Sequence, residues 1–309
     1  MSKPLISVVS TMYRSQGFLD RFVEQAFAAV RAMDHGGFEV ILVNDGSPDD
    51  SLAHALRLKQ RHPELVLVDL SRNFGHHAAL QAGLRVAKGD LVFLIDCDLE
   101  VPPAALVDLY RRQVETGADL VFGYQETRKG GWLERTSGSI FWKAFNLLSA
   151  TKAPENMLTE QVMTRRFVDS LLALGDRNLF LDGMIAWTGF VQVGLPIRKG
   201  LREGASTYTP LKRVRLMIDA VTSFSAQPLV WLFNIGVTIT LLSFTYVTYL
   251  VLRKVLLDDT LLGFTSVMAL VALSLGILMS ALGLVGIYLG KVFTQVQNRP
   301  NFIIKDIFR

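Results

Sequence analysis

The sequence predicts an α/β domain built on a mostly parallel sheet, followed by an interfacial helix and two transmembrane helices. Three observations predict this architecture. Short β-branched runs alternate with stretches of helical spacing over the first half of the 309 residues. Polar residues gather where these runs end, and two long segments after Pro228 contain no charged residue.

Five short apolar runs are predicted to be strands. They cover residues 5–10, 39–43, 65–70, 91–95 and 120–122. Between the first two runs, apolar residues recur at helical spacing from Phe18 to Val30, with Asp20 and Glu24 on the opposite face. A strand, helix, strand rhythm produces a parallel sheet with helices on both faces, and ligands bind at the carboxyl ends of its strands.

Four predicted strands are followed by polar loops that converge on one rim of the sheet. These loops contain Thr11, Tyr13 and Arg14, then Asn44 to Ser47, then Ser71 to His77, then Asp96 to Glu100. The first loop lacks G-x-G-x-x-G, and no P-loop string occurs, which argues against a dehydrogenase dinucleotide site and a P-loop nucleotide site. The second loop could also be only a tight turn with a helix cap. His76 and His77 point about 100° apart on a helix, so we expect them to cap or pack.

Asp96 and Asp98 are the most informative residues of the rim. In an extended chain they point the same way, while Cys97 points back into the fold and packs. Two carboxylates that project together repel each other, and a cation usually compensates that repulsion. Mg²⁺ or Mn²⁺ carrying a diphosphate fits, because these cations prefer oxygen ligands. The alternative is a solvated acidic turn before a helix that Pro102 and Pro103 open.

The apolar surplus, visible in a mean hydropathy of +0.32, is concentrated near the C-terminus. Residues 229–252 and 261–290 contain no charge, and each run exceeds the roughly 20 residues that cross a bilayer. Two buried core helices are the alternative, but such helices are shorter and usually carry a polar stripe. Basic residues flank the runs on their outer sides: Lys212, Arg213 and Arg215, then Lys291, Arg299, Lys305 and Arg309. The positive-inside rule therefore places both chain ends in the cytoplasm.

These features predict a multi-pass protein of the inner (cytoplasmic) membrane. We expect a catalytic domain over 1–208, a juxtamembrane amphipathic helix over 209–228, the two spans within 229–290, and a cytoplasmic tail over 291–309. The basic residues that give the chain its net charge of +4 lie next to the spans. This position favours an anionic membrane surface or a lipid phosphate as the binding partner and argues against nucleic acid. A single cysteine fits a reducing compartment. Small residues in the second span, including Gly286 and Gly290, favour helix packing and a homo-oligomer.

Several strings, taken in order, resemble glycosyltransferase family two, in particular the polyprenyl-phosphate glycosyltransferases related to dolichol-phosphate mannose synthase and the bactoprenol glucosyltransferases. The strings are VNDGSPDDS at 43–51, SRNFGHHAAL at 71–80, DCDLEVPP at 96–103, REGASTY at 202–208 and TSFSAQPL at 222–229. The resemblance covers nearly the whole chain. It implies a GT-A (Rossmann-like) fold that passes a sugar from a nucleotide-sugar to a lipid phosphate.

The resemblance also implies roles for individual residues. It places Asp45 at the nucleobase or ribose, Arg202 near the acceptor phosphate, and Asp96 and Asp98 at the metal. Together with the rim, it assigns donor contacts to Thr11, Tyr13, Asn44, Asp45, Arg72, Asn73, Asp96 and Arg128, and catalysis to Asp98, Glu160 and Arg202. Asn44 stands where relatives are acidic, and Val162 stands where many relatives have arginine. Glu160 takes the position of an acidic residue that is a base or orients the acceptor.

The function that we expect is an inverting, metal-dependent glycosyltransferase that uses a UDP-sugar and a polyprenyl (undecaprenyl) phosphate at the cytoplasmic face, in cell-envelope glycan synthesis. One alternative is a processive polysaccharide synthase, although no tryptophan completes a Gln-x-x-Arg-Trp string. The other alternative is a non-catalytic, membrane-bound nucleotide-sugar scaffold, which the residues at Asn44 and Val162 would allow.

Overall fold

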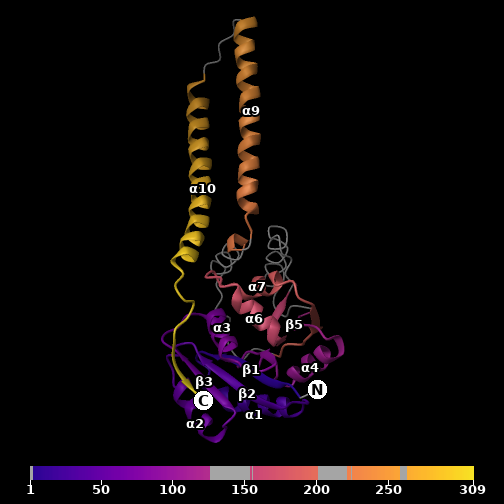
Figure 1. The fold of residues 1–309 in the computed structure, drawn as a ribbon. Helices are drawn as coiled ribbons and strands as arrows, with labels where there is room; N and C mark the ends of the chain where they lie inside the picture. Colours follow the sequence, from indigo (N-terminus) through magenta and orange to yellow (C-terminus); the bar gives the residue numbers. More distant parts are fainter. Residues whose placement is uncertain (1–2, 126–153, 155, 201–220, 224, 258–262) are drawn as a thin grey trace.

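The computed structural model describes residues 3–125, 154, 156–200, 221–223, 225–257 and 263–309. An eight-stranded sheet forms the body of the molecule, and two long helices extend from it (Figure 1). The strands are β1 (Leu5–Met12), β2 (Gly37–Asn44), β3 (Leu65–Leu70), β4 (Leu91–Leu94), β5 (Leu120–Tyr124), β6 (Met157–Thr164), β7 (Gln192–Pro196) and β8 (Ile304–Phe308). The helices are α1 (Leu19–Arg31), α2 (Ser51–Arg61), α3 (His76–Val86), α4 (Ala105–Thr116), α6 (Arg165–Ala173), α7 (Leu181–Trp187), α9 (Gln227–Leu257) and α10 (Phe264–Gln297).

The strand order is β7-β5-β6-β4-β1-β2-β3-β8, and only β6 and β8 run against the other strands of this sheet. The prediction of a mostly parallel sheet is therefore confirmed. The five predicted strands become β1 to β5, with ends that differ by at most two residues. β6, β7 and β8 were not predicted, because polar residues such as Glu160 in β6 and Lys305 in β8 interrupt their apolar pattern.

Helices cover both faces of the sheet, and each face has its own core. Val8 and Val9 of β1 point to opposite faces, as successive strand residues must. Phe22 of α1 is fully buried in the first core and Phe167 of α6 in the second. Burying a side chain of this size contributes roughly 1.5–3 kcal/mol relative to leaving it exposed. Two covered faces explain why the central strands are continuous apolar runs.

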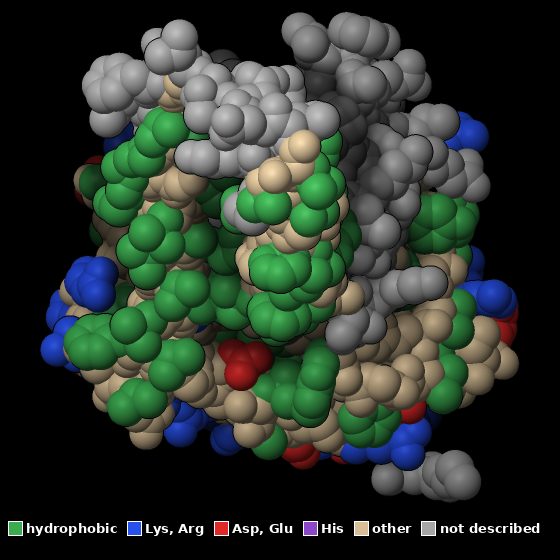
Figure 2. All heavy atoms as spheres, turned by 90° about the horizontal axis from the view of Figure 1, so that it is seen from above, with side chains coloured by type: hydrophobic (Ala, Val, Ile, Leu, Met, Phe, Trp, Pro, Cys, Tyr) green, Lys and Arg blue, Asp and Glu red, His purple; other side chains and the backbone are tan. Residues whose placement is uncertain are grey.

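α9 and α10 are long and apolar enough to span a membrane. The relevant segments are Gln227–Tyr249, with 23 residues, and Leu273–Gln297, with 25 residues. Their side chains point outward, and Phe244 is 73% exposed. The view from above shows hydrophobic side chains along both helices (Figure 2). An exposed apolar surface of this extent is typical of contact with lipid or with other helices. The predicted juxtamembrane helix lies mostly outside the described residues.

After α10 the chain returns to the sheet. β8 pairs antiparallel with β3, with Leu67 opposite Phe308 and Val68 opposite Ile307. The C-terminus accordingly lies beside β3 and far from the outer ends of the long helices (Figure 1). The tail that follows the second apolar helix is therefore an edge strand of the sheet.

Candidate active site

The turn after β2 is joined to the loop after β3 by hydrogen bonds that Asp45 accepts. Its Oδ1 accepts one from the Phe74 backbone N–H at 2.7 Å, and its Oδ2 accepts one from the Gly75 N–H at 3.0 Å. The Asn73 amide donates to the Asp45 carbonyl at 3.0 Å. Burial raises the pKa of Asp45, and the two backbone hydrogen bonds oppose that rise only in part. The predicted donor residues Asp45 and Asn73 thus lie together.

Gly46 permits the close contact between this turn and the loop after β3. Its φ is +59°, in the left-handed region that favours glycine. A Cβ at this position would lie 2.4 Å from the Asn73 backbone nitrogen and 2.6 Å from the Arg72 carbonyl carbon. The two loops therefore form one unit that only glycine allows.

Asn44 is buried, and both polar atoms of its side-chain amide form hydrogen bonds. Its Nδ2 donates to Asp69 Oδ1 at 2.7 Å, and its Oδ1 accepts from the Ser47 N–H at 3.1 Å. A side chain held in this way supports the turn from its buried side. Its direct contact with the nucleotide stays a prediction.

Three further predicted donor residues surround this unit. Thr11 Oγ1 lies 3.1 Å from His76 Nδ1, at the start of α3. The guanidinium of Arg72 lies over the Phe74 ring, 4.2 Å from its centroid, in cation–π geometry. Tyr13 is 46% exposed at the rim. The remaining predicted contacts, Arg128 and Arg202, lie outside the described residues.

The second part of the rim is acidic. Asp98 Oδ1 accepts a hydrogen bond from the Glu100 N–H at 3.0 Å, and Asp96 Oδ1 lies 3.6 Å from His76 Nε2. Burial raises the pKa of Asp98, and the neighbouring charges of Asp96 and Glu100 raise it further. The structure therefore brings the predicted pair together in an environment that disfavours two negative charges.

Glu160 joins this acidic group through the register of the sheet. β6 runs antiparallel to β4, with Gln161 opposite Leu94, so Glu160 lies beside the end of β4. Glu160 is 1% exposed, and its Oε2 has no hydrogen-bond partner among the described residues. Burial, with the charge of Asp96, raises the pKa of Glu160 to about 7.

Lys199 is a charged group of the site that the sequence did not reveal. It follows β7, and its Nζ lies 3.1 Å from Glu100 Oε2. Burial lowers the pKa of Lys199, but the hydrogen bond to Glu100 and the charges of Glu100, Glu160 and Asp96 outweigh burial and raise it. Its position at a strand end was the available signal, but β7 was not predicted. The charge of Lys199 also opposes the rise in the pKa of Glu160, so the two side chains interact electrostatically.

The family model described as glycosyl transferase family 2 matches residues 7–172. The chain belongs to glycosyl transferase family 2. The match extends from β1 to the end of α6, so it includes Asp45, Asp96, Asp98 and Glu160. Lys199, both long helices and β8 lie beyond it.

The matches between this family 2 chain and individual relatives extend beyond the residues that the family model covers. A Mycobacterium tuberculosis protein, named as a glycosyltransferase with no stated substrate, is 40% identical over 98% of this chain and 88% of its own length. The prophage-derived bactoprenol glucosyl transferase of Shigella flexneri is 33% identical, with 88% of each chain covered. The prophage bactoprenol glucosyl transferase homolog of Escherichia coli K12 is 31% identical over 87% of this chain and 88% of its own length.

The fold is also found in a solved structure. A mannosyltransferase from Pyrobaculum calidifontis, in complex with GDP-mannose and Mn²⁺, matches with a TM-score of 0.50 and 18% identity. The match covers 71% of this chain and 64% of that one. The family 2 domain therefore has the GT-A-like fold that the sequence resemblance implies.

The acidic group suits a cation that a second ligand helps to hold. No group of three His, Cys, Asp or Glu side chains within the described ranges is placed to hold a metal ion by itself. Asp96 and Asp98 supply carboxylate oxygens, which suit Mg²⁺ or Mn²⁺ when phosphates and water complete the coordination. Cys97 is unsuited, because burial raises the pKa of its thiol to about 12 and its Sγ donates to the Thr11 carbonyl. The donor set of this family 2 enzyme thus fits a metal-bound diphosphate.

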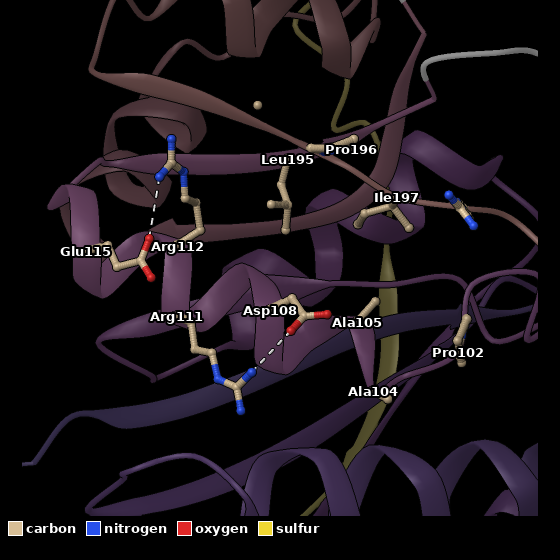
Figure 3. Close-up of a pocket in the computed structure, with 12 residues that line it drawn as sticks. Pro102, Ala104, Ala105, Asp108, Arg111, Arg112, Glu115, Leu195, Pro196 and Ile197 are labelled. Atoms are coloured by element: carbon tan, nitrogen blue, oxygen red, sulfur yellow. Dashed lines mark hydrogen bonds and ion pairs between the residues drawn. The ribbon is translucent and has the colours of Figure 1, made fainter.

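Two cavities lie near this site. One, of about 710 Å³, lies between α4 and β7. Four of its charged residues form pairs along α4, Arg111 with Asp108 and Arg112 with Glu115, and Arg198 also lines it (Figure 3). None of the predicted site residues that the structure describes lines it. The second, of about 90 Å³, is lined by residues that include His76, His77, Gln161 and Asp182. Burial lowers the pKa of His77 to about 4 and raises that of Asp182 to about 6.

Proposed function

We propose that this chain is an inverting glycosyltransferase of the inner membrane that transfers a sugar from a nucleotide-sugar, with a UDP-sugar favoured, to polyprenyl (undecaprenyl) phosphate. One observation carries the proposal: an acidic rim, formed by the half-buried Asp96 and Asp98 and the buried Glu160, belongs to a family 2 domain that shares its chain with two apolar helices. The named glucosyl transferases support the acceptor. α9 begins at Gln227, so a match of 276 residues must include part of the apolar helices.

On the donor side, the unit formed by Asp45, Gly46 and Asn73 receives the nucleoside. Its backbone is already held in place by internal hydrogen bonds, so binding does not have to order it. Asp96 and Asp98 would hold a divalent cation together with the diphosphate. When bound, that cation neutralises the negative charge that develops on the leaving nucleotide.

On the acceptor side, a phosphate monoester is already anionic near pH 7, so attack requires little help from a base. Its oxygen forms a bond to the anomeric carbon while the bond from that carbon to the diphosphate breaks, and the electron pair leaves with the nucleotide. Attack from the opposite face inverts the anomeric configuration. Lys199 lowers the repulsion between the incoming phosphate and the acidic group. Glu160, which interacts electrostatically with both Asp96 and Lys199, orients the acceptor.

The membrane topology of the proposal places the active site on the side where the acceptor phosphate lies. Two spans return the chain to the side from which it started, and β8 pairs with β3 of the N-terminal domain. Both chain ends therefore lie on one face of the membrane. The basic residues that flank the apolar helices favour the cytoplasmic face.

The test is a donor panel. Membranes that contain the chain would be incubated with undecaprenyl phosphate, Mg²⁺ or Mn²⁺, and UDP-, GDP- or dTDP-sugars. We expect a chloroform-soluble glycolipid with at least one donor, and inverted configuration at its anomeric carbon by NMR. Membranes with Asp98→Asn are the matched control. Absence of lipid product with every donor would reject the proposal, and a long water-soluble polymer as sole product would indicate a processive synthase.

A further inference from the structure

The C-terminal tail contacts the loop after β3, which is one of the two loops that form the nucleoside side of the site. β8 lies along β3, and the Ser71 backbone N–H donates to the Ile303 carbonyl at 3.0 Å. Since β3 ends at Leu70, this hydrogen bond extends the pairing beyond the strand. It reaches the first residue of the loop that contains Asn73. The tail therefore supports that loop directly.

A second connection runs through Asp69, whose side chain is 6% exposed. Its Oδ2 lies 3.4 Å from Lys305 Nζ in β8, and its Oδ1 accepts the hydrogen bond from Asn44. A buried carboxylate needs such partners, because burial of a charge without them is costly. Asn44 in turn accepts a hydrogen bond from the Ser47 N–H. A continuous series of contacts thus links Lys305 to the turn that contains Asp45.

Other contacts hold the tail independently of Lys305. The Asn301 amide donates to Gln81 Oε1 at 3.0 Å and to the Asp176 carbonyl at 2.8 Å. At the end of α10, Gln295 Oε1 accepts from the Arg177 N–H at 2.9 Å. A single substitution at Lys305 should therefore change the charge beside Asp69 without releasing the strand.

We infer that β8 belongs to the donor site, with Lys305 and Asp69 as positioning residues. Lys305 holds the Asp69 carboxylate toward Asn44, and Asn44 fixes the turn that receives the nucleoside. The family match ends at residue 172, so β8 and Lys305 lie outside the family domain, whereas Asp69 and Asn44 lie within it. The inference rests on the proposed function, because it treats that turn as the nucleoside subsite.

A purely structural role for β8 makes a different prediction. An edge strand that only covers β3 stabilises the sheet through backbone pairing and apolar contacts, whatever the charge at position 305. A positioning role requires the positive charge. The two roles can therefore be separated by a substitution that removes the charge and by a second substitution that keeps it.

The experiment uses the full chain, purified in detergent, as Lys305→Gln and Lys305→Arg. Arg299→Gln is the matched control, because it removes the same charge from an exposed residue of the same tail. Binding of UDP and of GDP with Mn²⁺ would be measured by calorimetry. Hydrogen exchange at residues 44–51 would be measured without ligand. A third variant, Asp69→Asn, with and without Lys305→Gln, tests whether the two residues act together.

We expect Lys305→Gln to weaken nucleotide binding about fivefold and to accelerate exchange at residues 44–51. Lys305→Arg should restore both values, and Arg299→Gln should match the unaltered chain. In the Asp69→Asn background, Lys305→Gln should have no further effect. A lower thermal midpoint with unchanged affinity and exchange would overturn the inference. If the unaltered chain binds no nucleotide, the proposed function fails, while unchanged exchange at 44–51 would still separately reject the positioning role.

Discussion

The nucleoside side and the acidic side of the rim differ in how far contacts within the chain satisfy their carboxylates. On the nucleoside side, both carboxylate oxygens of Asp45 accept backbone hydrogen bonds, and Gly46 allows the loops to touch. On the acidic side, the charge of Asp96 disfavours the ionised form of Asp98, and Glu160 Oε2 has no hydrogen-bond partner in the described ranges. The first side is complete before a ligand binds. Among the described residues, Lys199 opposes this negative charge, and a bound cation would compensate it further, so chemistry is concentrated there.

The largest effect should come from breaking the acidic side. We expect Asp98→Asn to reduce turnover by roughly 10²–10³-fold, because the charge that supports the leaving diphosphate is lost. Radiolabelled transfer to undecaprenyl phosphate would measure it. Asp108→Asn is the control, since that exposed carboxylate only pairs with Arg111 on α4. Retention of the cellular role by Asp98→Asn would instead support a non-catalytic scaffold.

A substitution in the turn on the nucleoside side should lower both the stability of the fold and the affinity for nucleotide. Gly46→Ala should lower the free energy of unfolding by about 2–4 kcal/mol, because the new Cβ meets the backbone at Asn73 and the φ is left-handed. Chemical denaturation and calorimetry with UDP would measure the two losses. Gly117→Ala isolates the conformational part. Gly117 has φ +63°, but a Cβ added there would have no neighbouring atom within 4 Å, so that variant should lose only about 1–2 kcal/mol and keep nucleotide affinity.

The two sides also differ in how far the sequence predicts them. Asp45, Asp96 and Asp98 follow strands that are buried on both faces, and such strands are visible as apolar runs. The strand-end rule then places all three residues on one rim. The sequence predicted these residues because one local pattern, a β-branched run followed by polar residues, locates both the strand and its end.

Lys199, Asp69 and the tail could not be found in this way. Each acquires its role from a pairing between distant segments: β7 with β5 for Lys199, and β3 with β8 for Asp69 and the tail. Lys305 and Asp306 make β8 look like a charged tail, and no spacing in the sequence indicates that it returns to β3. Non-local pairing of short, mixed strands leaves no periodic signal.

Cation binding should sharpen the comparison, because it should stabilise only the acidic side. A cation at ten times its Kd that binds only the folded chain would add about 1.4 kcal/mol to the free energy of unfolding. Mg²⁺ or Mn²⁺ should therefore raise the thermal midpoint, and EDTA should reverse the increase. Asp98→Asn should lose most of the increment, whereas Gly46→Ala should keep it. Equal increments in the unaltered chain and in Asp98→Asn would place the cation elsewhere.

An effect of similar size concerns Asp182, a carboxyl that belongs to neither side. Burial alone raises its pKa in the folded chain from 3.8 to about 6. The folded state therefore favours the protonated form, and the contribution of Asp182 to stability is present below about pH 4 and is lost as the pH rises through 6. Relative to the unaltered chain, Asp182→Asn should gain about 1–2 kcal/mol between these limits.

Thermal midpoints of the two chains from pH 4 to pH 7 would measure this gain as a difference, in which the titration of Asp98 and Glu160 cancels. Added Mg²⁺ distinguishes Asp182 from the carboxyl groups of the acidic side. No neighbouring charge among the described residues contributes to the raised pKa of Asp182, so a cation at Asp96 and Asp98 should leave the difference unchanged. If the cation removed the difference, Asp182 would be electrostatically coupled to the acidic side. The small cavity beside His76 would then be continuous with the diphosphate site.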